Sequence, residues 1–183
     1  MPGNVLKFAR VSIIGHNRSM ARVYVGIGSN LGDRSAQMKR TCDRLAEVDQ
    51  TELLRVSPVY ETDPVGPVPQ GPFLNGVAEL ETKLVPERLL GKLNEIEQES
   101  GRPEPVRRVK WGPRSLDLDI ILFEDRVICN DRLVIPHPLM HERWFVLKPL
   151  CDLNPNVVHP LLEMTVGALL RYLEDTSDND EES

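Results

Sequence analysis

One stretch of the chain, Leu116–Phe123 (LDLDIILF), constrains the fold most, because acidic and aliphatic residues alternate along its first half. Side chains of a β-strand point alternately to the two faces of its sheet, so Asp117 and Asp119 share one face, about 6–7 Å apart along the backbone. Leu118 and Ile120 point the other way, into a core. The pattern therefore predicts a strand whose sheet has one apolar, covered face and one polar, accessible face.

The two aspartates on this strand suit a hard divalent cation. Magnesium commonly takes one or two protein carboxylates and completes its coordination with water and substrate phosphates. Two such ions, about 4 Å apart, clamp the attacking and leaving oxygens in many phosphoryl transfers. The same pattern is also compatible with an ordinary half-exposed strand, since short acidic motifs occur by chance.

The segment just before this strand is strongly basic and favours the metal interpretation. It holds one acid, Glu104, and five cationic residues: Arg102, Arg107, Arg108, Lys110 and Arg114. Guanidinium groups bind phosphate oxygens in bidentate fashion and keep their charge at any working pH. A cation cluster beside a carboxylate pair is what a metal–triphosphate complex requires. For Arg107 and Arg108 individually, an ordinary solvated loop remains the alternative.

Residue periodicity predicts the other elements. Strands are expected at Arg22–Gly28, Glu52–Tyr60 and Phe73–Glu81, with a hairpin within Asp125–Val134. Helices are expected after the N-cap residue Asp33, from Pro86 to Gly101, from Pro138 to Trp144 and from Val166 to Leu173. The proline-dense stretch Thr62–Pro72 must be a loop, because proline lacks a backbone donor. This mixture predicts one compact α+β domain with a largely antiparallel sheet.

A single folded domain is expected over residues 21–173 of the 183-residue chain, and the two ends outside it differ from it in composition. Residues 1–20 carry cations and no acid, so they are either a loose or mis-assigned extension or a targeting segment. Residues 174–183 hold six acids and predict a disordered tail. No apolar run approaches the roughly 20 residues of a membrane helix. The three widely spaced cysteines fit a reducing, cytoplasmic setting.

The segment Lys110–Ile121 (KWGPRSLDLDII) resembles the signature of the 6-hydroxymethyl-7,8-dihydropterin pyrophosphokinase family. Other landmarks of that family follow in the same order: GSNLGD at 28–33, YETDPVG at 60–66, FLN at 73–75 and VIPH at 134–137. The similarity runs from about Val23 to Leu153. It implies a ferredoxin-like α+β sandwich that transfers the diphosphate of ATP to the hydroxymethyl group of the pterin, releasing AMP, in folate biosynthesis.

The resemblance also implies how ATP and metal are bound. Asp117 and Asp119 would hold two Mg²⁺ ions that bridge the ATP phosphates. Arg102 and Arg114 match basic residues that stabilise the transferred diphosphate, which makes these four residues the expected catalytic set. The ATP-binding residues it implies are Arg114, Trp111, His137 and Arg143. The segment Arg102–Trp111 is similar to the family's mobile lid.

For the pterin, the resemblance implies a slot between two aromatic rings, Phe73 and Phe145. Asn75 carries both donors and acceptors for the amide-like edge of the pterin. Glu97 and the loop from Thr62 to Val65 also match pterin-contacting positions. Phe73 stands where some relatives have tyrosine, so stacking is kept while a hydroxyl contact is lost.

Two other functions remain alternatives. A kinase that attacks the γ-phosphorus of ATP is one, although the chain has no GxxxxGK[ST] loop. A ferredoxin-like module that binds nucleic acid is the other, and it predicts exposed aromatic residues and a basic surface. Aromatic residues make up only 5% of the chain, and its net charge of −6 equals the six acids of the tail. We therefore expect an enzyme that binds neither nucleic acid nor membrane, and the family resemblance implies a monomer.

Overall fold

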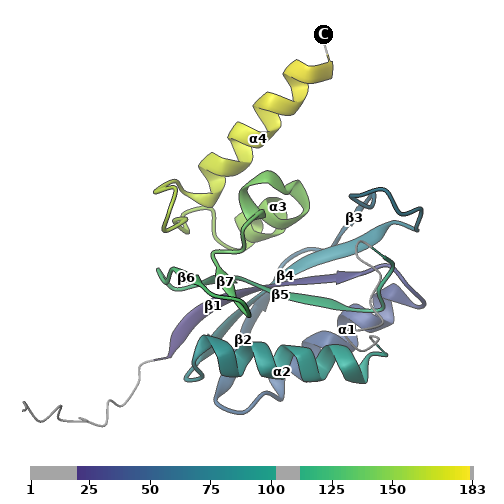
Figure 1. The fold of residues 1–183 in the computed structure, drawn as a ribbon, viewed down its shortest axis with the longest axis vertical. Helices are drawn as coiled ribbons and strands as arrows, with labels where there is room; N and C mark the ends of the chain where they lie inside the picture. The colour runs from purple at the N-terminus through teal and green to yellow at the C-terminus, as the bar shows by residue number, and fades with distance from the viewer. Residues whose placement is uncertain (1–19, 102–111, 182–183) are drawn as a thin grey trace, which may run out of the picture.

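The computed structural model describes residues 20–101 and 112–181 (Figure 1). One antiparallel sheet is built from β1 (Ala21–Ser29), β2 (Thr51–Val56), β3 (Tyr60–Thr62), β4 (Phe73–Thr82) and β5 (Asp117–Phe123). Its order is β2–β4–β1–β5, and β3 pairs with β4 beyond the end of β2. A separate hairpin joins β6 (Ile128–Cys129) to β7 (Val134–Ile135).

Helices cover both faces of this sheet (Figure 1). The helices are α1 (Arg34–Ala46), α2 (Pro86–Glu99), α3 (Trp144–Leu153) and α4 (Val166–Glu181). The first two pack against one face, where Leu118 and Ile120 join the larger apolar core, as the alternation predicts. The last two belong to a second core on the opposite face, together with Tyr24 and Val77.

Most predicted elements are confirmed, including the local signals that begin the helices. Asp33 caps α1, because its carboxylate accepts a hydrogen bond of 3.0 Å from the backbone of Ala36. Pro86 occupies the first position of α2, where its missing donor costs nothing. The left-handed backbone of Gly101, with φ of 82°, follows the end of that helix.

The single strand predicted at Glu52–Tyr60 is wrong, because the chain forms two strands, β2 and β3, separated at Ser57–Val59. Ser57 explains the break. Its backbone N–H donates to the carbonyl of Val77, and its hydroxyl accepts from the backbone N–H of Val77, both at 2.9 Å. The side chain therefore replaces a ladder carbonyl next to Pro58, which has no donor of its own.

The helix predicted from Pro138 to Trp144 is also wrong. Only a short 3₁₀ turn, Met140–Glu142, forms there, and α3 begins at Trp144, where the prediction ends. The buried positions of α3 follow helical spacing and are Val146, Leu147, Pro149, Leu150 and Leu153. Pro149 inside the helix, normally a breaker, obscured this signal in the sequence.

The C-terminal helix is longer than the sequence predicts. We expect a helix from Val166 to Leu173 and a disordered acidic tail from residue 174, whereas α4 continues to Glu181. Glu174 accepts a hydrogen bond of 3.0 Å from the indole of Trp144 in α3. Figure 1 shows the far end of α4 directed away from the sheet. None of the helices described, α1 to α4, is long and apolar enough to span a membrane.

Candidate active site

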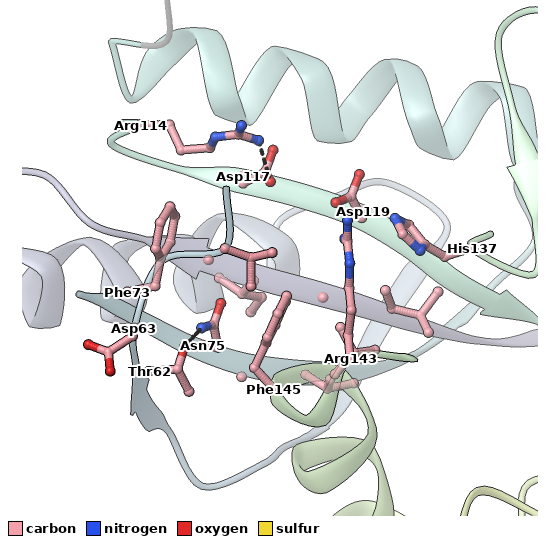
Figure 2. Close-up of a pocket in the computed structure, with 18 of the residues that line it drawn as sticks. Thr62, Asp63, Phe73, Asn75, Arg114, Asp117, Asp119, His137, Arg143 and Phe145 are labelled. Atoms are coloured by element: carbon pink, nitrogen blue, oxygen red, sulfur yellow. Dashed lines mark hydrogen bonds and ion pairs between the residues drawn. The ribbon is translucent and has the colours of Figure 1, made fainter. Parts of the chain in front are cut away.

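One pocket opens on the α3 side of the sheet (Figure 2). Its lining residues come from four stretches of the chain: 26–28, 62–77, 114–121 and 137–146. Strands β1, β4 and β5 form its floor, the loop after β3 forms one side, and the segment from His137 into α3 forms another. From the predicted set, it is lined by Thr62, Val65, Phe73, Asn75, Arg114, Asp117, Asp119, His137, Arg143 and Phe145. These residues span most of the chain, and only the fold brings them together.

Two glycines of β1, Gly26 and Gly28, leave the floor of the pocket open. A Cβ atom on Gly28 would lie 3.2 Å from Oδ1 of Asn75 and 3.8 Å from Cβ of Asp117. A Cβ on Gly26 would lie 3.1 Å from the Ile121 side chain. Any side chain here would therefore enter the space in front of the aspartates. The alternation of glycine in VGIG carries this signal in the sequence, although neither glycine was predicted as a site residue.

The two aspartates line this space from β5, opposite those glycines. Asp117 pairs in register with Gly28 and Asp119 with Gly26. Arg114 donates a hydrogen bond of 2.7 Å to Oδ2 of Asp117, and both side chains are about one quarter exposed. Two carboxylates on one strand, facing an open floor, fit a Mg²⁺ ion. Within residues 20–101 and 112–181, no group of three or more His, Cys, Asp or Glu could hold a metal, so water and phosphate would complete its coordination.

Asn30, in the turn after β1, fixes the backbone of Arg114 and was not predicted as a site residue. Its Oδ1 accepts a hydrogen bond of 2.8 Å from the backbone N–H of Arg114, and its own N–H donates to the Arg114 carbonyl at 3.1 Å. Its amide nitrogen donates to Gln70 and to the carbonyl of Gly71, at 2.9 and 3.2 Å. This buried amide therefore ties together three segments around the pocket.

His137 and Arg143 approach the aspartates from the other side. The carbonyl of Ile121 accepts a hydrogen bond of 2.9 Å from the His137 backbone, at the point where β5 bulges against β1. Bulges of this kind redirect groups near functional sites. Figure 2 shows the guanidinium of Arg143 directed toward Asp119, and it also lies 5.6 Å from the ring centre of Phe145.

The imidazole of His137 is neutral at physiological pH. Burial, with help from the charge of Arg143, lowers its pKa from 6.5 to about 4. Nδ1 accepts a hydrogen bond of 3.2 Å from the backbone N–H of Leu139, which places the remaining proton on Nε2. His137 can therefore donate a hydrogen bond without adding charge to the pocket.

The opposite half of the pocket is aromatic and carries an amide. Figure 2 shows the rings of Phe73 and Phe145 directed into the pocket, with Asn75 drawn between them. The side-chain nitrogen of Asn75 donates to the Thr62 hydroxyl at 2.8 Å, which fixes the amide orientation. A flat heterocycle between such rings would gain about 0.5–1.5 kcal/mol beyond burial alone.

One predicted site residue that the structure describes, Glu97, does not line the pocket. Glu97 is buried beneath the opposite face of the sheet, where Oε1 accepts a hydrogen bond of 2.7 Å from the backbone of Leu118. The prediction that it contacts the pterin is corrected on this ground, because β5 lies between Glu97 and the pocket. Arg102 and Trp111, and the lid predicted between them, lie outside the described residues.

The sequence was compared with protein families and with known proteins. The sequence profile of the 7,8-dihydro-6-hydroxymethylpterin-pyrophosphokinase family matches residues 24–155. A protein of Pseudomonas aeruginosa named 2-amino-4-hydroxy-6-hydroxymethyldihydropteridine pyrophosphokinase is 48% identical over 139 residues, which are 76% of this chain and 84% of the relative. One of the same name from Aquifex aeolicus is 44% identical over 142 residues, covering 78% of this chain and 86% of that one.

Solved structures agree on the fold. A crystal structure of Plasmodium falciparum HPPK-DHPS superposes with a TM-score of 0.67 at 16% identity, covering 88% of this chain and 45% of that chain. Another, with pterin and p-hydroxybenzoate, gives a TM-score of 0.69 at 17% identity. The present chain spans less than half the length of these two chains, and the likeness confirms the ferredoxin-like α+β fold alone.

Proposed function

Because the chain belongs to the 7,8-dihydro-6-hydroxymethylpterin-pyrophosphokinase family, it is an ATP-dependent pyrophosphokinase of folate biosynthesis, and we propose which residues of its pocket bind and position the two substrates. The hydroxyl oxygen of 6-hydroxymethyl-7,8-dihydropterin attacks the β-phosphorus of ATP. The bond from this phosphorus to the oxygen that bridges it to the α-phosphorus breaks, AMP leaves, and the hydroxyl proton is released.

One observation carries the proposal: a charged half and an aromatic half share one pocket. Asp117, Asp119 and Arg114 line the first, and Phe73 and Phe145 line the second. The acceptor hydroxyl of a pterin held in the aromatic half would face phosphates held in the charged half. Holding two substrates in reacting geometry can contribute several kcal/mol to lowering the barrier, because it replaces a bimolecular encounter.

In the charged half, Asp117 and Asp119 would hold Mg²⁺, with two ions expected. When bound, magnesium supplies positive charge to the ATP phosphates and orients them. Arg114 lies within hydrogen-bond distance of Asp117 and can turn its remaining donors to a phosphate oxygen. Arg143 brings a second permanent charge toward Asp119. His137 would donate from Nε2 without repelling these cations, because it is neutral.

In the aromatic half, Phe73 and Phe145 would stack on the two faces of the pterin. One N–H of Asn75 donates to Thr62 and fixes the amide, so its oxygen can accept from the pterin edge and its second N–H can donate to it. Backbone groups of the loop that contains Thr62 and Val65 would satisfy the remaining polar atoms. The roles of Arg102 and Trp111, a monomeric state and a cytoplasmic location stay predictions from the sequence.

The test is nucleotide analysis after incubating the protein with MgCl₂, ATP and 6-hydroxymethyl-7,8-dihydropterin. We expect AMP and pterin diphosphate in equal amounts, and neither product when the pterin or the metal is omitted. Formation of ADP in step with a pterin monophosphate would instead identify a γ-phosphoryl kinase and overturn the proposed reaction. A Phe145→Ala variant should raise the KM for the pterin more than the KM for ATP, and an unchanged pterin KM would overturn the assigned slot.

A further inference from the structure

Tyr60, at the start of β3, contacts α3 at three successive turns. Its hydroxyl donates a hydrogen bond of 2.5 Å to Oδ2 of Asp152. Its ring packs edge-on against Trp144, with centroids 5.4 Å apart, and the ammonium of Lys148 lies 5.3 Å from the ring centre. These three residues recur every fourth position, so they form one stripe along the helix. The apolar face that buries α3 is a different one.

The two elements joined by Tyr60 carry opposite walls of the pocket. β3 ends at Thr62, whose hydroxyl accepts from Asn75 and whose strand pairs with Phe73. On the other side, α3 carries Phe145, directly after Trp144 in the sequence. Phe73 belongs to β4 and is paired to Thr62 of β3, so the distance between the two phenylalanine rings depends on where α3 lies relative to the β3–β4 pair.

Two side-chain contacts hold β3 besides its pairing with β4: Glu61 pairs with Arg34 of α1 at 2.7 Å, and Thr62 accepts from Asn75 at 2.8 Å. Neither contact reaches α3. β3 is only three residues long and lies between the break at Pro58 and the proline-dense loop that follows Thr62. Its backbone pairs with β4 alone. The hydrogen bond between Lys148 and Asp152 lies within α3 and cannot fix the helix against the sheet. The bond from Tyr60 to Asp152 joins the two elements, so it can.

On these contacts, and resting on the proposed function for the identity of the ligand, we propose that Tyr60 and Asp152 are positioning residues that set the width of the pterin slot. The hydroxyl of Tyr60 anchors β3 to α3, and this holds the ring of Phe145 at stacking distance from Phe73. Neither residue lines the pocket, so the pair acts through the two walls and not by touching substrate. A flat pterin requires this fixed spacing, because stacking weakens steeply when a gap opens on either face.

The test is Tyr60→Phe, which keeps the ring against Trp144 and removes only the hydroxyl. We expect the KM for the pterin to rise about 3- to 10-fold, as loss of one charge-assisted hydrogen bond allows, with the KM for ATP within about twofold of wild type. Asp152→Ala should raise the pterin KM by a similar factor. Asp152→Asn keeps an acceptor, so its pterin KM should rise less. The double variant Tyr60→Phe/Asp152→Ala should have a pterin KM no higher than that of either single variant. Tyr172→Phe, at an exposed tyrosine of α4, is the matched control and should change neither constant.

Outcomes that contradict the inference are distinct from those that contradict the proposed function. If Phe145→Ala raises the pterin KM and Tyr60→Phe does not, the slot is real and its width is set elsewhere. If Tyr60→Phe raises the KM for both substrates equally and lowers the melting temperature, the residue is merely structural and the inference fails. If Phe145→Ala itself leaves the pterin KM unchanged, the assigned slot fails first, and the inference fails with it.

Discussion

The two faces of β5 show how one strand serves two purposes. Leu118 and Ile120 are almost fully buried in the core on the α2 side of the sheet, whereas Asp117 and Asp119 line the pocket on the other side. Successive residues therefore contribute to different properties, one set to stability and the other to chemistry. The core face holds the carboxylates in place, because a strand fixed by its apolar side chains cannot turn its polar ones away.

The largest effect is expected on the pocket face. Asp119→Asn removes a carboxylate charge from the proposed metal site while keeping side-chain size, so we expect kcat to fall about 10²- to 10³-fold. The melting temperature should stay near that of wild type. Steady-state kinetics and calorimetric melting check both points. Full turnover in this variant would break the assignment of chemistry to this face.

The neighbouring residue on the core face should behave in the opposite way. Leu118→Ala leaves a cavity beneath the sheet and should lower the free energy of unfolding by about 3 kcal/mol. Urea titration measures this change. Activity per folded molecule should remain within a few fold of wild type at a temperature where the variant is folded. A stable but inactive Leu118→Ala protein would show that the two faces are not separable.

On the pocket face, His137 should make the free energy of unfolding of the protein depend on pH. Its folded pKa of about 4 lies below the unfolded value of 6.5, so the unfolded state binds more protons between these two values. Stability is therefore unaffected above pH 6.5 and falls as pH drops from 6.5 toward 4, by at most about 2–3 kcal/mol. Unfolding of wild type and His137→Gln at pH 7.5 and pH 4.5 should give a smaller loss for the variant. Equal losses would remove His137 as the cause.

The smallest effect tests the corrected position of Glu97. Glu97→Ala leaves the buried N–H of Leu118 without its acceptor and should cost about 1–3 kcal/mol of stability. Glu97→Gln keeps an acceptor oxygen and should cost less. The pterin KM should be unchanged in both variants when measured below their melting temperatures. An increased pterin KM in Glu97→Gln would restore the earlier assignment of this residue to the pterin site.

Part of the site was predictable from local signals, whereas the residues of its aromatic half were expected from the family resemblance. The aspartate pair follows from strand alternation, and Asp33 and Pro86 begin helices through contacts within a single turn. The errors occur where distant parts of the chain decide the outcome. Ser57 ends β2 by bonding to Val77 in another strand, and α3 forms despite Pro149 because its apolar face is buried against the sheet.

By itself, the sequence indicated which chemistry the chain carries, because its motifs, from GSNLGD to VIPH, resemble those of one family in residue type and in order. It also determined the α+β class, because periodicity records which side of each element is buried. Only the tertiary structure decided that Glu97 lies under the sheet, that Asn30 ties three segments together, and that Tyr60 joins the two walls of the pocket. Each of these depends on contacts between residues far apart in sequence, and such contacts leave no local pattern.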